Sequence, residues 1–321
     1  MDQQTALGSR HVLSQEPFNA EAGEGAFAQF LTPAEQRFVR NHFEVPLLGA
    51  GHAVEIGGAV VRPRRLSLAE LRAMARLSLT VVTECAGNGR ASFEPKVEGE
   101  PWQNRAVSAA QWTGVPLSAV LQLKDAAVEV VFTGADGGEY RRSLPREAAM
   151  DPATLLAWEM NGAPIPPRFG GPLRLIVPGW YGMASVKWLA RIEAVEEPFD
   201  GRFQTEKYVY AAGDPVTRIR VKSMFTEVAP PRIVGLAWGG EGVTQVSVQI
   251  EGRWREARLV GPALPHAWRR FELQWTPPRP GRYALRCRAT DARGETQPES
   301  PRWNRLGYGA NGVQEMIALV E

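Results

Sequence analysis

The chain contains few of the residues that bind metals or form disulfides. Its 321 residues include two cysteines, Cys85 and Cys287, and four histidines. The two cysteines lie far apart in the sequence, and no C-x-x-C or C-x-x-C-H motif is present. A disulfide framework is therefore unfavoured, and the common zinc and haem motifs are excluded.

The chain also lacks long apolar runs and an excess of charge. No stretch approaches the roughly 20 apolar residues that a membrane span needs, and the first 25 residues have no apolar region of the signal-peptide type. Lys and Arg number 37, Asp and Glu 35, and the net charge is +2. This balance gives no electrostatic reason to expect nucleic acid or an anionic membrane as a partner. We expect a cytoplasmic protein, or a periplasmic one if a leader has been removed.

The length of the chain and a change in the pattern of predicted helices and strands indicate two domains. A chain of 321 residues exceeds what one hydrophobic core usually serves. In the first two thirds, short strands at 127–134 and 172–179 mix with helical patches. Residues 67–77 have helical spacing with Ser67 as N-cap. Residues 146–162 begin helically, break at Pro152 and end in an Asn-Gly turn.

From about residue 215 the pattern is that of β-structure alone. The segment VTQVSVQIEGRWREARLV alternates apolar residues and turns through Glu251 and Gly252, which is typical of a hairpin. RRFELQW and RYALRCRATD add alternating strands, so we predict a small antiparallel sandwich. The boundary is placed after Gly213, giving domains of residues 1–213 and 214–321. Cys287 alternates with Tyr283 and Leu285 and is interpreted as a buried core thiol.

The other cysteine stands at the end of a predicted strand, in VVTECAGNGRASFEP, residues 81–95. As a packed thiol, Cys85 would be inert. As a nucleophile it would need a histidine as base. As a thiolate ligand, among small residues that let a metal approach the backbone, it would suit a metal that accepts sulfur. Composition and spacing leave these three roles open. The histidines available to the second role are His11, His42, His52 and His266.

The segment CAGNGR resembles the cysteine loop of the sulfite oxidase family of molybdenum enzymes. The resemblance continues in order through FLTPAEQRFVRNHFEVP, AVSAAQWTGVPLSAVL, the long segment from GADGGEYRR to VKWLARIE, and PRWNRLGYGANG. It implies an α+β molybdopterin-binding domain of sulfite oxidase type over residues 1–213. It also implies that the all-β domain over residues 214–321 is an immunoglobulin-like sandwich that pairs two subunits into a homodimer.

The resemblance implies a molybdenum–molybdopterin cofactor, in which a pterin dithiolene and the sulfur of Cys85 hold the metal. A bound metal cation removes the thiol proton. Because the pterin carries a phosphate, its site should present positive charge and N–H donors. Arg174 in an apolar strand and Lys187 within ASVKWL are hard to explain without a buried anion, whereas Asp136 also fits a turn residue. The cofactor-binding residues implied are Phe38, Val39, Arg40, Asn41, His42, Asp136, Phe169, Arg174, Ser185, Val186 and Lys187.

The resemblance also implies a substrate pocket for a small oxyanion. The planar fork of arginine suits such an anion, although each arginine taken alone also fits a surface ion pair. The hydroxyl of the pocket tyrosine would orient substrate. The catalytic residues implied are Arg40, Cys85, Arg90, Trp102 and Tyr208.

Three positions depart from the family's pattern. Phe169 stands where many members have a histidine. The hydrogen bond that the histidine would make to the cofactor must come from another group, or it is not made. Glu98 stands where the family has a lysine, and Glu315 aligns with an arginine of animal and plant members. A glutamate about 4 Å from the substrate would repel it by roughly 4 kcal/mol or more at an effective dielectric constant of about 20. Either Glu315 points away, or the substrate is less negative than sulfite.

The sequence thus predicts an oxidoreductase that oxidises sulfite to sulfate by oxo transfer. No haem-binding motif is present, so the electrons are expected to pass to a separate acceptor such as a cytochrome, a small oxidant or dioxygen. One alternative is a reductase for S-oxides or N-oxides, which the weakened positive pocket motivates. A second alternative is a non-catalytic binding protein with a decayed site, motivated by the three departures.

Overall fold

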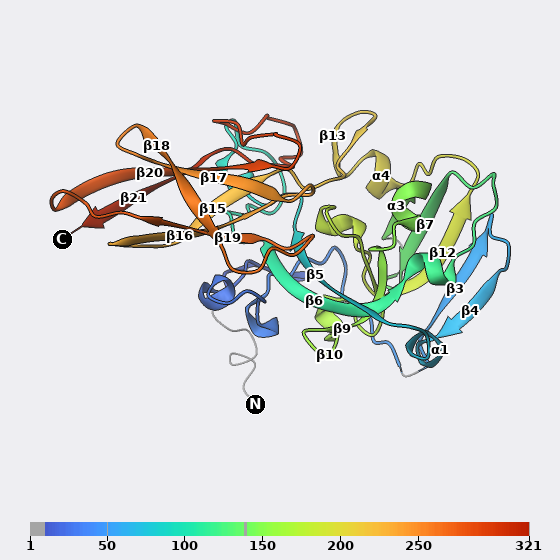
Figure 1. Cartoon of the computed structure of the whole chain (residues 1–321). Helices are drawn as coiled ribbons and strands as arrows, with labels where there is room; N and C mark the ends of the chain where they lie inside the picture. The colour runs from blue at the N-terminus through green and yellow to red at the C-terminus, as the bar shows by residue number, and fades with distance from the viewer. Residues whose placement is uncertain (1–9, 50, 138–139, 321) are drawn as a thin grey trace.

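The computed structural model describes residues 10–49, 51–137 and 140–320. A sheet built from the C-terminal strands lies at one end of the molecule, and a sheet containing β3 and β12 lies at the other (Figure 1). Strands β5, β6 and β9 lie between these two ends. Within the described ranges, no helix combines the length and the apolar character that crossing a membrane requires.

The middle sheet is antiparallel and carries the cysteine loop at the end of one strand. Its order is β10-β9-β6-β5, with β11 also paired to β9. Val81 and Val82 are buried, as expected of the strand that leads to Cys85. The strand bounds are β5 (Leu77–Glu84), β6 (Val107–Pro116), β9 (Leu155–Met160), β10 (Ala163–Pro164) and β11 (Arg174–Ile176).

The far sheet has the order β4-β3-β12-β7-β8. Strand β12 runs parallel to β3, and the other pairs are antiparallel. The strand predicted at 127–134 is confirmed as β7, and the one predicted at 172–179 is the shorter β11. The bounds are β3 (Ala53–Gly58), β4 (Arg64–Ser67), β7 (Glu129–Gly134), β8 (Arg141–Pro145) and β12 (Leu189–Val195).

The helices are short. The predicted N-cap at Ser67 is confirmed, because its hydroxyl accepts from the Glu70 N–H at 3.2 Å while the Glu70 carboxylate accepts from the Ser67 N–H at 2.8 Å. The helix ends at Arg72 rather than at residue 77, since β5 begins at Leu77. The helical bounds are α1 (Leu68–Arg72), α2 (Leu117–Val120), α3 (Arg146–Met150) and α4 (Arg202–Thr205).

The segment after Pro152 differs from the sequence-based expectation. Helix α3 forms where it was predicted and ends before Pro152, but the apolar run beyond Pro152 is strand β9, which was not predicted from the sequence. The Asn-Gly turn is confirmed, since Asn161 and Gly162 have φ of 53° and 78° and connect β9 to β10.

The C-terminal strands form one antiparallel sheet in the order β15-β16-β19-β18-β17-β20-β21. Strand β15 also packs against β20, so the sheet closes on itself to make the predicted all-β sandwich. The predicted hairpin is confirmed as β17 and β18, and the Cys287 side chain is fully buried in the core of this sheet. The bounds are β15 (Lys222–Ala229), β16 (Arg232–Trp238), β17 (Val243–Ile250), β18 (Arg253–Val260), β19 (Arg269–Gln274), β20 (Gly281–Asp291) and β21 (Gln314–Val320).

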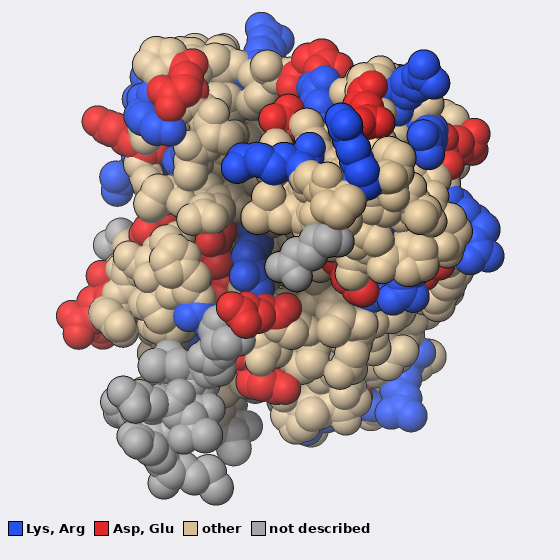
Figure 2. Space-filling view, turned by 90° about the vertical axis from the view of Figure 1, so that its left-hand side faces the viewer, with Lys and Arg blue, Asp and Glu red and all other residues tan. Residues whose placement is uncertain are grey.

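Two small hairpins complete the described strands. One pairs β1 (Val12–Gln15) with β2 (Phe18–Ala20), and the other pairs β13 (Val209–Ala211) with β14 (Asp214–Pro215). The domain boundary predicted after Gly213 falls in the turn of the second hairpin and stays a prediction. On the face that the C-terminal end presents, Lys and Arg side chains are interspersed with Asp and Glu (Figure 2), in keeping with the balanced composition.

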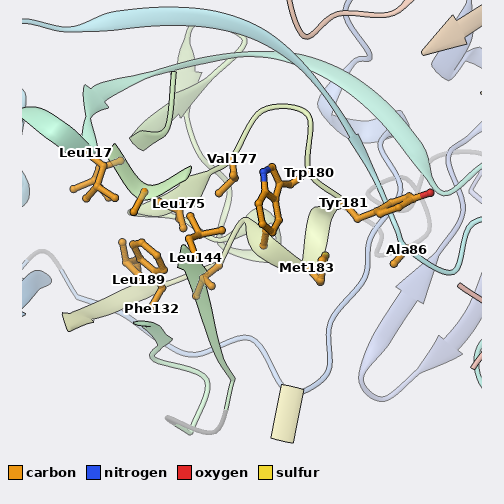
Figure 3. Close-up of a cluster of buried hydrophobic side chains, with 14 of the residues drawn as sticks. Ala86, Leu117, Phe132, Leu144, Leu175, Val177, Trp180, Tyr181, Met183 and Leu189 are labelled. Atoms are coloured by element: carbon orange, nitrogen blue, oxygen red, sulfur yellow. The ribbon is translucent and has the colours of Figure 1, made fainter. Parts of the chain in front are cut away.

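The main hydrophobic core runs up to the cysteine loop. Buried side chains extend from Leu117 and Phe132 through Leu175 to Tyr181 and Ala86 (Figure 3). Because protein interiors are close-packed, this contact restrains the residue that follows Cys85.

A buried polar cluster ties the C-terminal sheet to the same loop. Glu84, the last residue of β5, accepts hydrogen bonds from Asn88 Nδ2 and Trp238 Nε1, each at 2.8 Å. Lys222 Nζ lies 3.7 Å from the Glu84 carboxylate and donates to the Asn88 carbonyl at 3.2 Å. Since Trp238 and Lys222 belong to β16 and β15, the sandwich holds the strand that presents Cys85.

We predict that Lys222→Met lowers the free energy of unfolding by about 3–5 kcal/mol, because it leaves the Glu84 carboxylate buried without its cation. The Glu84→Gln/Lys222→Met double variant should recover most of this loss. Urea unfolding followed by circular dichroism measures both effects.

The matched control is Arg232→Met, which breaks the exposed ion pair with Glu227 at 3.5 Å. Such a pair contributes about 0–1 kcal/mol. A loss in Lys222→Met no larger than that in Arg232→Met would contradict the assignment.

Candidate active site

The loop after β5 holds Cys85 in a fixed turn. The Cys85 N–H donates to the Ala106 carbonyl and the Cys85 carbonyl accepts from the Asn88 N–H, both at 2.9 Å. A Cβ on Gly87 would lie 2.7 Å from the Arg90 guanidinium. Any side chain at Gly87 would therefore displace the arginine that packs against the loop.

The Cys85 thiol is 8% exposed. Burial raises its pKa, and the positive charges of Arg40 and Arg90 oppose that rise. In the described part of the chain, no cluster of three His, Cys, Asp or Glu side chains could hold a metal ion.

A cavity opens beside Cys85 and includes most of the residues predicted to bind the cofactor. Val39 and Val186 are buried in the packed interior instead. The predicted residues that line it are Phe38, Arg40, Asn41, His42, Asp136, Phe169, Arg174, Ser185 and Lys187, together with Cys85 and Tyr208 from the catalytic set.

Other lining residues were missed by sequence reasoning. Arg37 carried a signal, because it is a charged residue directly before the matching segment that starts at Phe38. The others come from segments with apolar patterns that look like ordinary core. They are Thr83, Ala86, Tyr140, Gly182, Met183 and Trp188.

One end of the cavity is positively charged. Arg174 donates to the carbonyls of Phe169 at 2.6 Å and Ser185 at 2.9 Å. Lys187 Nζ donates to the Arg40 carbonyl at 2.9 Å and to Asn41 Oδ1 at 2.5 Å. Burial lowers the pKa of Arg174 to about 9, and burial beside other cations lowers the pKa of Lys187 well below its usual value.

Arg37 adds a third buried cation at this end. It is 3% exposed, and its Nε and Nη1 have no hydrogen-bond acceptor within the described ranges. None of the ion pairs found among the described residues includes Arg37, Arg174 or Lys187. Buried charge of one sign is costly unless an opposite charge compensates it, so this end is suited to an anion.

Arg40, His42 and Tyr208 form a chain of hydrogen bonds along the cavity wall. Arg40 Nη2 lies 3.1 Å from His42 Nδ1, and His42 Nε2 lies 2.6 Å from the Tyr208 hydroxyl oxygen. Because arginine can only donate, Nδ1 accepts and the proton of the neutral ring is on Nε2. That proton is donated to the Tyr208 oxygen, which leaves the Tyr208 O–H available to donate to a ligand.

A recess next to the cavity shares Arg40 and His42 with it and is lined by further cations, Arg90, Arg202 and Lys207. Arg90 donates to the carbonyls of Glu100 at 3.0 Å and Leu306 at 3.1 Å. Neither Arg40 nor Arg90 makes an ion pair with another described residue. A surface ion pair, which could have explained each arginine taken alone, is therefore not found in this part of the chain.

The remaining expected pocket residues lie in three different places. Glu98 is exposed and lines the recess with Arg40 and Arg90. Glu315 points away, because it lies on β21 with its carboxylate 3.8 Å from Arg286 Nε. Trp102 is fully buried in the main core and lines neither the cavity nor the recess, so its role in the pocket stays a prediction.

Comparison with known proteins identifies the family. A profile of the oxidoreductase molybdopterin binding domain matches residues 42–203. Sulfite oxidase of Gallus gallus is 34% identical over 343 residues, covering 92% of this chain and 75% of the relative. The chain belongs to the sulfite oxidase family.

Two further relatives extend this result. Mitochondrial sulfite oxidase of Homo sapiens is 33% identical, covering 96% of this chain, which spans 65% of that relative's length. The crystal structure of the sulfane dehydrogenase SoxCD from Paracoccus pantotrophus has a TM-score of 0.85 and 28% identity, covering 100% of this chain and 92% of that one. The fold class predicted from the sequence is confirmed.

The site fits the molybdenum–molybdopterin cofactor of this family of oxidoreductases. Cys85 offers the sulfur donor that the metal prefers. The N–H groups of Arg37 that find no acceptor among the described residues lie beside Arg174 and Lys187, and together these cations suit an anionic group such as the phosphate. Asn41, Ser185 and the backbone around them supply further polar groups along the cavity.

Protonation of His42 should be suppressed in the folded chain. Burial, and then the charges of Arg40, Lys187, Lys207 and Arg202, lower its pKa from 6.5 to about 2. As pH falls below 6.5, the unfolded chain takes up a proton that the folded chain does not, so stability falls. Between pH 7 and pH 5 the loss is about 2 kcal/mol.

The measurement is urea unfolding of the cofactor-free full chain at pH 7 and pH 5, for the parent and His42→Gln. The parent should lose about 2 kcal/mol more than the variant over this range. Equal losses in the two proteins would contradict a neutral His42.

Proposed function

We propose that this protein oxidises sulfite to sulfate and passes the electrons to an external acceptor. The observation that carries the proposal is the cluster of cations Arg40, Arg90, Arg202 and Lys207 around the recess that adjoins the Cys85 cavity. A small oxyanion would gain charge-assisted hydrogen bonds there. The relatives named sulfite oxidase support the same substrate.

When bound, the cofactor supplies two-electron redox chemistry coupled to transfer of an oxygen atom. The chain's own residues bind and orient the anion, with Arg40 and Arg90 as its cations. Tyr208 donates its hydroxyl proton in a hydrogen bond to an oxygen of the anion, while His42 holds that hydroxyl in place through Nε2. Overall, sulfite and water become sulfate, two protons and two electrons.

The electron acceptor is proposed to be a separate protein such as a cytochrome, a small oxidant or dioxygen. Pairing of two subunits through the C-terminal sandwich, and a cytoplasmic location, stay predictions of the sequence. The non-catalytic alternative is disfavoured, because the family is one of oxidoreductases. Of the three departures that motivated it, Glu315 lies away from the cavity, whereas Phe169 lines the cavity and Glu98 lines the recess.

Reduction of an S-oxide or N-oxide is a second candidate, and Glu98 favours it. Its carboxylate lines the recess with Arg40 and Arg90 and offsets part of their charge. A substrate less negative than sulfite would bind such a recess with less repulsion. Oxidation of a sulfane sulfur is a related candidate. Its support is that the solved relative is named a sulfane dehydrogenase.

The proposal is tested by steady-state assays of the molybdenum-loaded protein. We expect sulfite to reduce ferricyanide or a soluble cytochrome, with an apparent KM for sulfite that rises as salt screens the arginines. The first candidate would be overturned if the protein did not oxidise sulfite but reduced a sulfoxide with a reduced dye, or turned over a sulfane donor. Either result would favour a substrate that is less negative than sulfite.

The matched variant for substrate charge is Glu98→Gln. It should lower the KM for sulfite by up to about fivefold, by removing a repulsion of at most about 1 kcal/mol in this exposed position. An unchanged KM would mean that the Glu98 carboxylate does not act on the bound substrate.

A further inference from the structure

Two unusual features of this chain meet at the positive end of the cavity. Phe169 stands where many members of the family have a histidine, so no ring nitrogen is present there. The Arg37 guanidinium lies over this same ring, 5.8 Å from its centroid, and also 5.4 Å from the Trp112 ring. Both Arg37 and Phe169 line the cavity.

The backbone around Arg37 is held firmly, which fixes where its side chain begins. The Arg37 carbonyl accepts from Arg10 Nε at 2.6 Å. Two residues further on, Val39 exchanges hydrogen bonds with Ala20 at 2.8 and 3.0 Å. The two aromatic rings then limit the guanidinium to one side of the cavity.

Part of this guanidinium makes no hydrogen bond to the residues that the structure describes. Arg37 is 3% exposed, and its Nε and Nη1 have no acceptor in the part of the chain that the structure describes. Arg174, its neighbour, differs in this respect, because its two terminal nitrogens donate to the carbonyls of Phe169 and Ser185. A buried guanidinium with unmade hydrogen bonds is costly, and a bound acceptor removes that cost.

The positive charges around Arg37 favour an anionic acceptor for its N–H groups. Burial, and then the charges of Arg174 and Arg10, lower the pKa of Arg37 to about 9. Lys187 experiences the positive charges of Arg174, Arg40 and Arg37, and the Asp136 carboxylate offsets them only in part, since its effect is smaller than that of Arg174 alone. A neutral acceptor would satisfy the N–H groups but would leave this accumulation of charge uncompensated.

We propose that Arg37 is a cofactor-binding residue that donates hydrogen bonds to the anionic phosphate of the pterin, beside Arg174, and thereby supplies the hydrogen bonding that the Phe169 ring cannot provide. The guanidinium fork supplies two parallel donors, whereas a neutral imidazole supplies one. The assignment rests on the cofactor class and not on sulfite as substrate.

The test compares Arg37→Leu with the double variant Arg37→Leu/Phe169→His, both as full chains matured in a host that makes the cofactor. Each protein is diluted and passed through gel filtration. The cofactor that it retains is then measured as molybdenum per chain and as pterin fluorescence after oxidation. We expect the single variant to release the cofactor at least about tenfold faster than the parent, which is the effect of removing one charge-assisted hydrogen bond. The double variant should regain retention.

The matched control is Arg105→Leu. Arg105 also has a buried Nε without an acceptor among the described residues and also lies over an aromatic ring, at 5.7 Å from the Phe27 centroid, but it does not line the cavity. It should retain the cofactor at the parent rate. Equal release from the control and Arg37→Leu would show a general effect of removing a buried arginine and would overturn the proposal.

A second readout uses inorganic phosphate with the cofactor-free full chain. Millimolar phosphate should raise the Tm of the parent and of Arg105→Leu, and raise that of Arg37→Leu by less. Arg37→Lys, which keeps the charge without the fork, should lie between the parent and Arg37→Leu in both readouts, and it serves as the test variant if Arg37→Leu does not fold.

Besides equal release from the control, three results would overturn the assignment. They are an unchanged release rate in Arg37→Leu, no difference in phosphate response between that variant and the parent, and a failure of Phe169→His to restore retention. A protein that retains its cofactor normally but does not oxidise sulfite would contradict the proposed function and leave Arg37 in its role.

Discussion

The position of the Cys85 sulfur depends on the carboxylate that precedes it. Glu84 is buried and bonded to Asn88 within the loop and to Trp238 and Lys222 of the C-terminal sheet. The same carboxylate therefore fixes the turn that presents the thiol and attaches the sandwich to it. Hydrogen bonds of this kind in a low-dielectric interior are strong and costly to break, so the sulfur is held in place before any metal binds.

The cavity beside that sulfur is organised by charge. The cations Arg37, Arg174 and Lys187 line it, and the adjoining recess shares Arg40 with it and adds Arg90. Each group of cations is suited to bind an anion. The first group would bind a buried anion in the cavity, and the second would bind an anion in the recess. His42, whose pKa is lowered by burial and then by the charges of Arg40 and Lys187, connects the two regions through Arg40 and Tyr208. In the proposed function, a single positive field serves both the cofactor and an anionic substrate.

The sequence revealed the parts of this site that lie in contiguous motifs. Cys85, Arg40 and Lys187 were found because their neighbours match the family segments, and the hairpin at 243–260 was found because its side chains alternate. Strand β9 was missed because a short apolar run after a proline does not distinguish helix from strand. The direction of Glu315 depends on its pairing with Arg286 across β20 and β21, a register that only the folded sheet sets.

The most direct test of this account is the number of sulfur atoms bound to the metal. X-ray absorption at the molybdenum K-edge, on the loaded parent and on loaded Cys85→Ser, measures that number. The account predicts one sulfur ligand fewer in the variant, with the pterin sulfurs retained. The same sulfur count in both proteins would show that the Cys85 thiol is not a ligand of the metal.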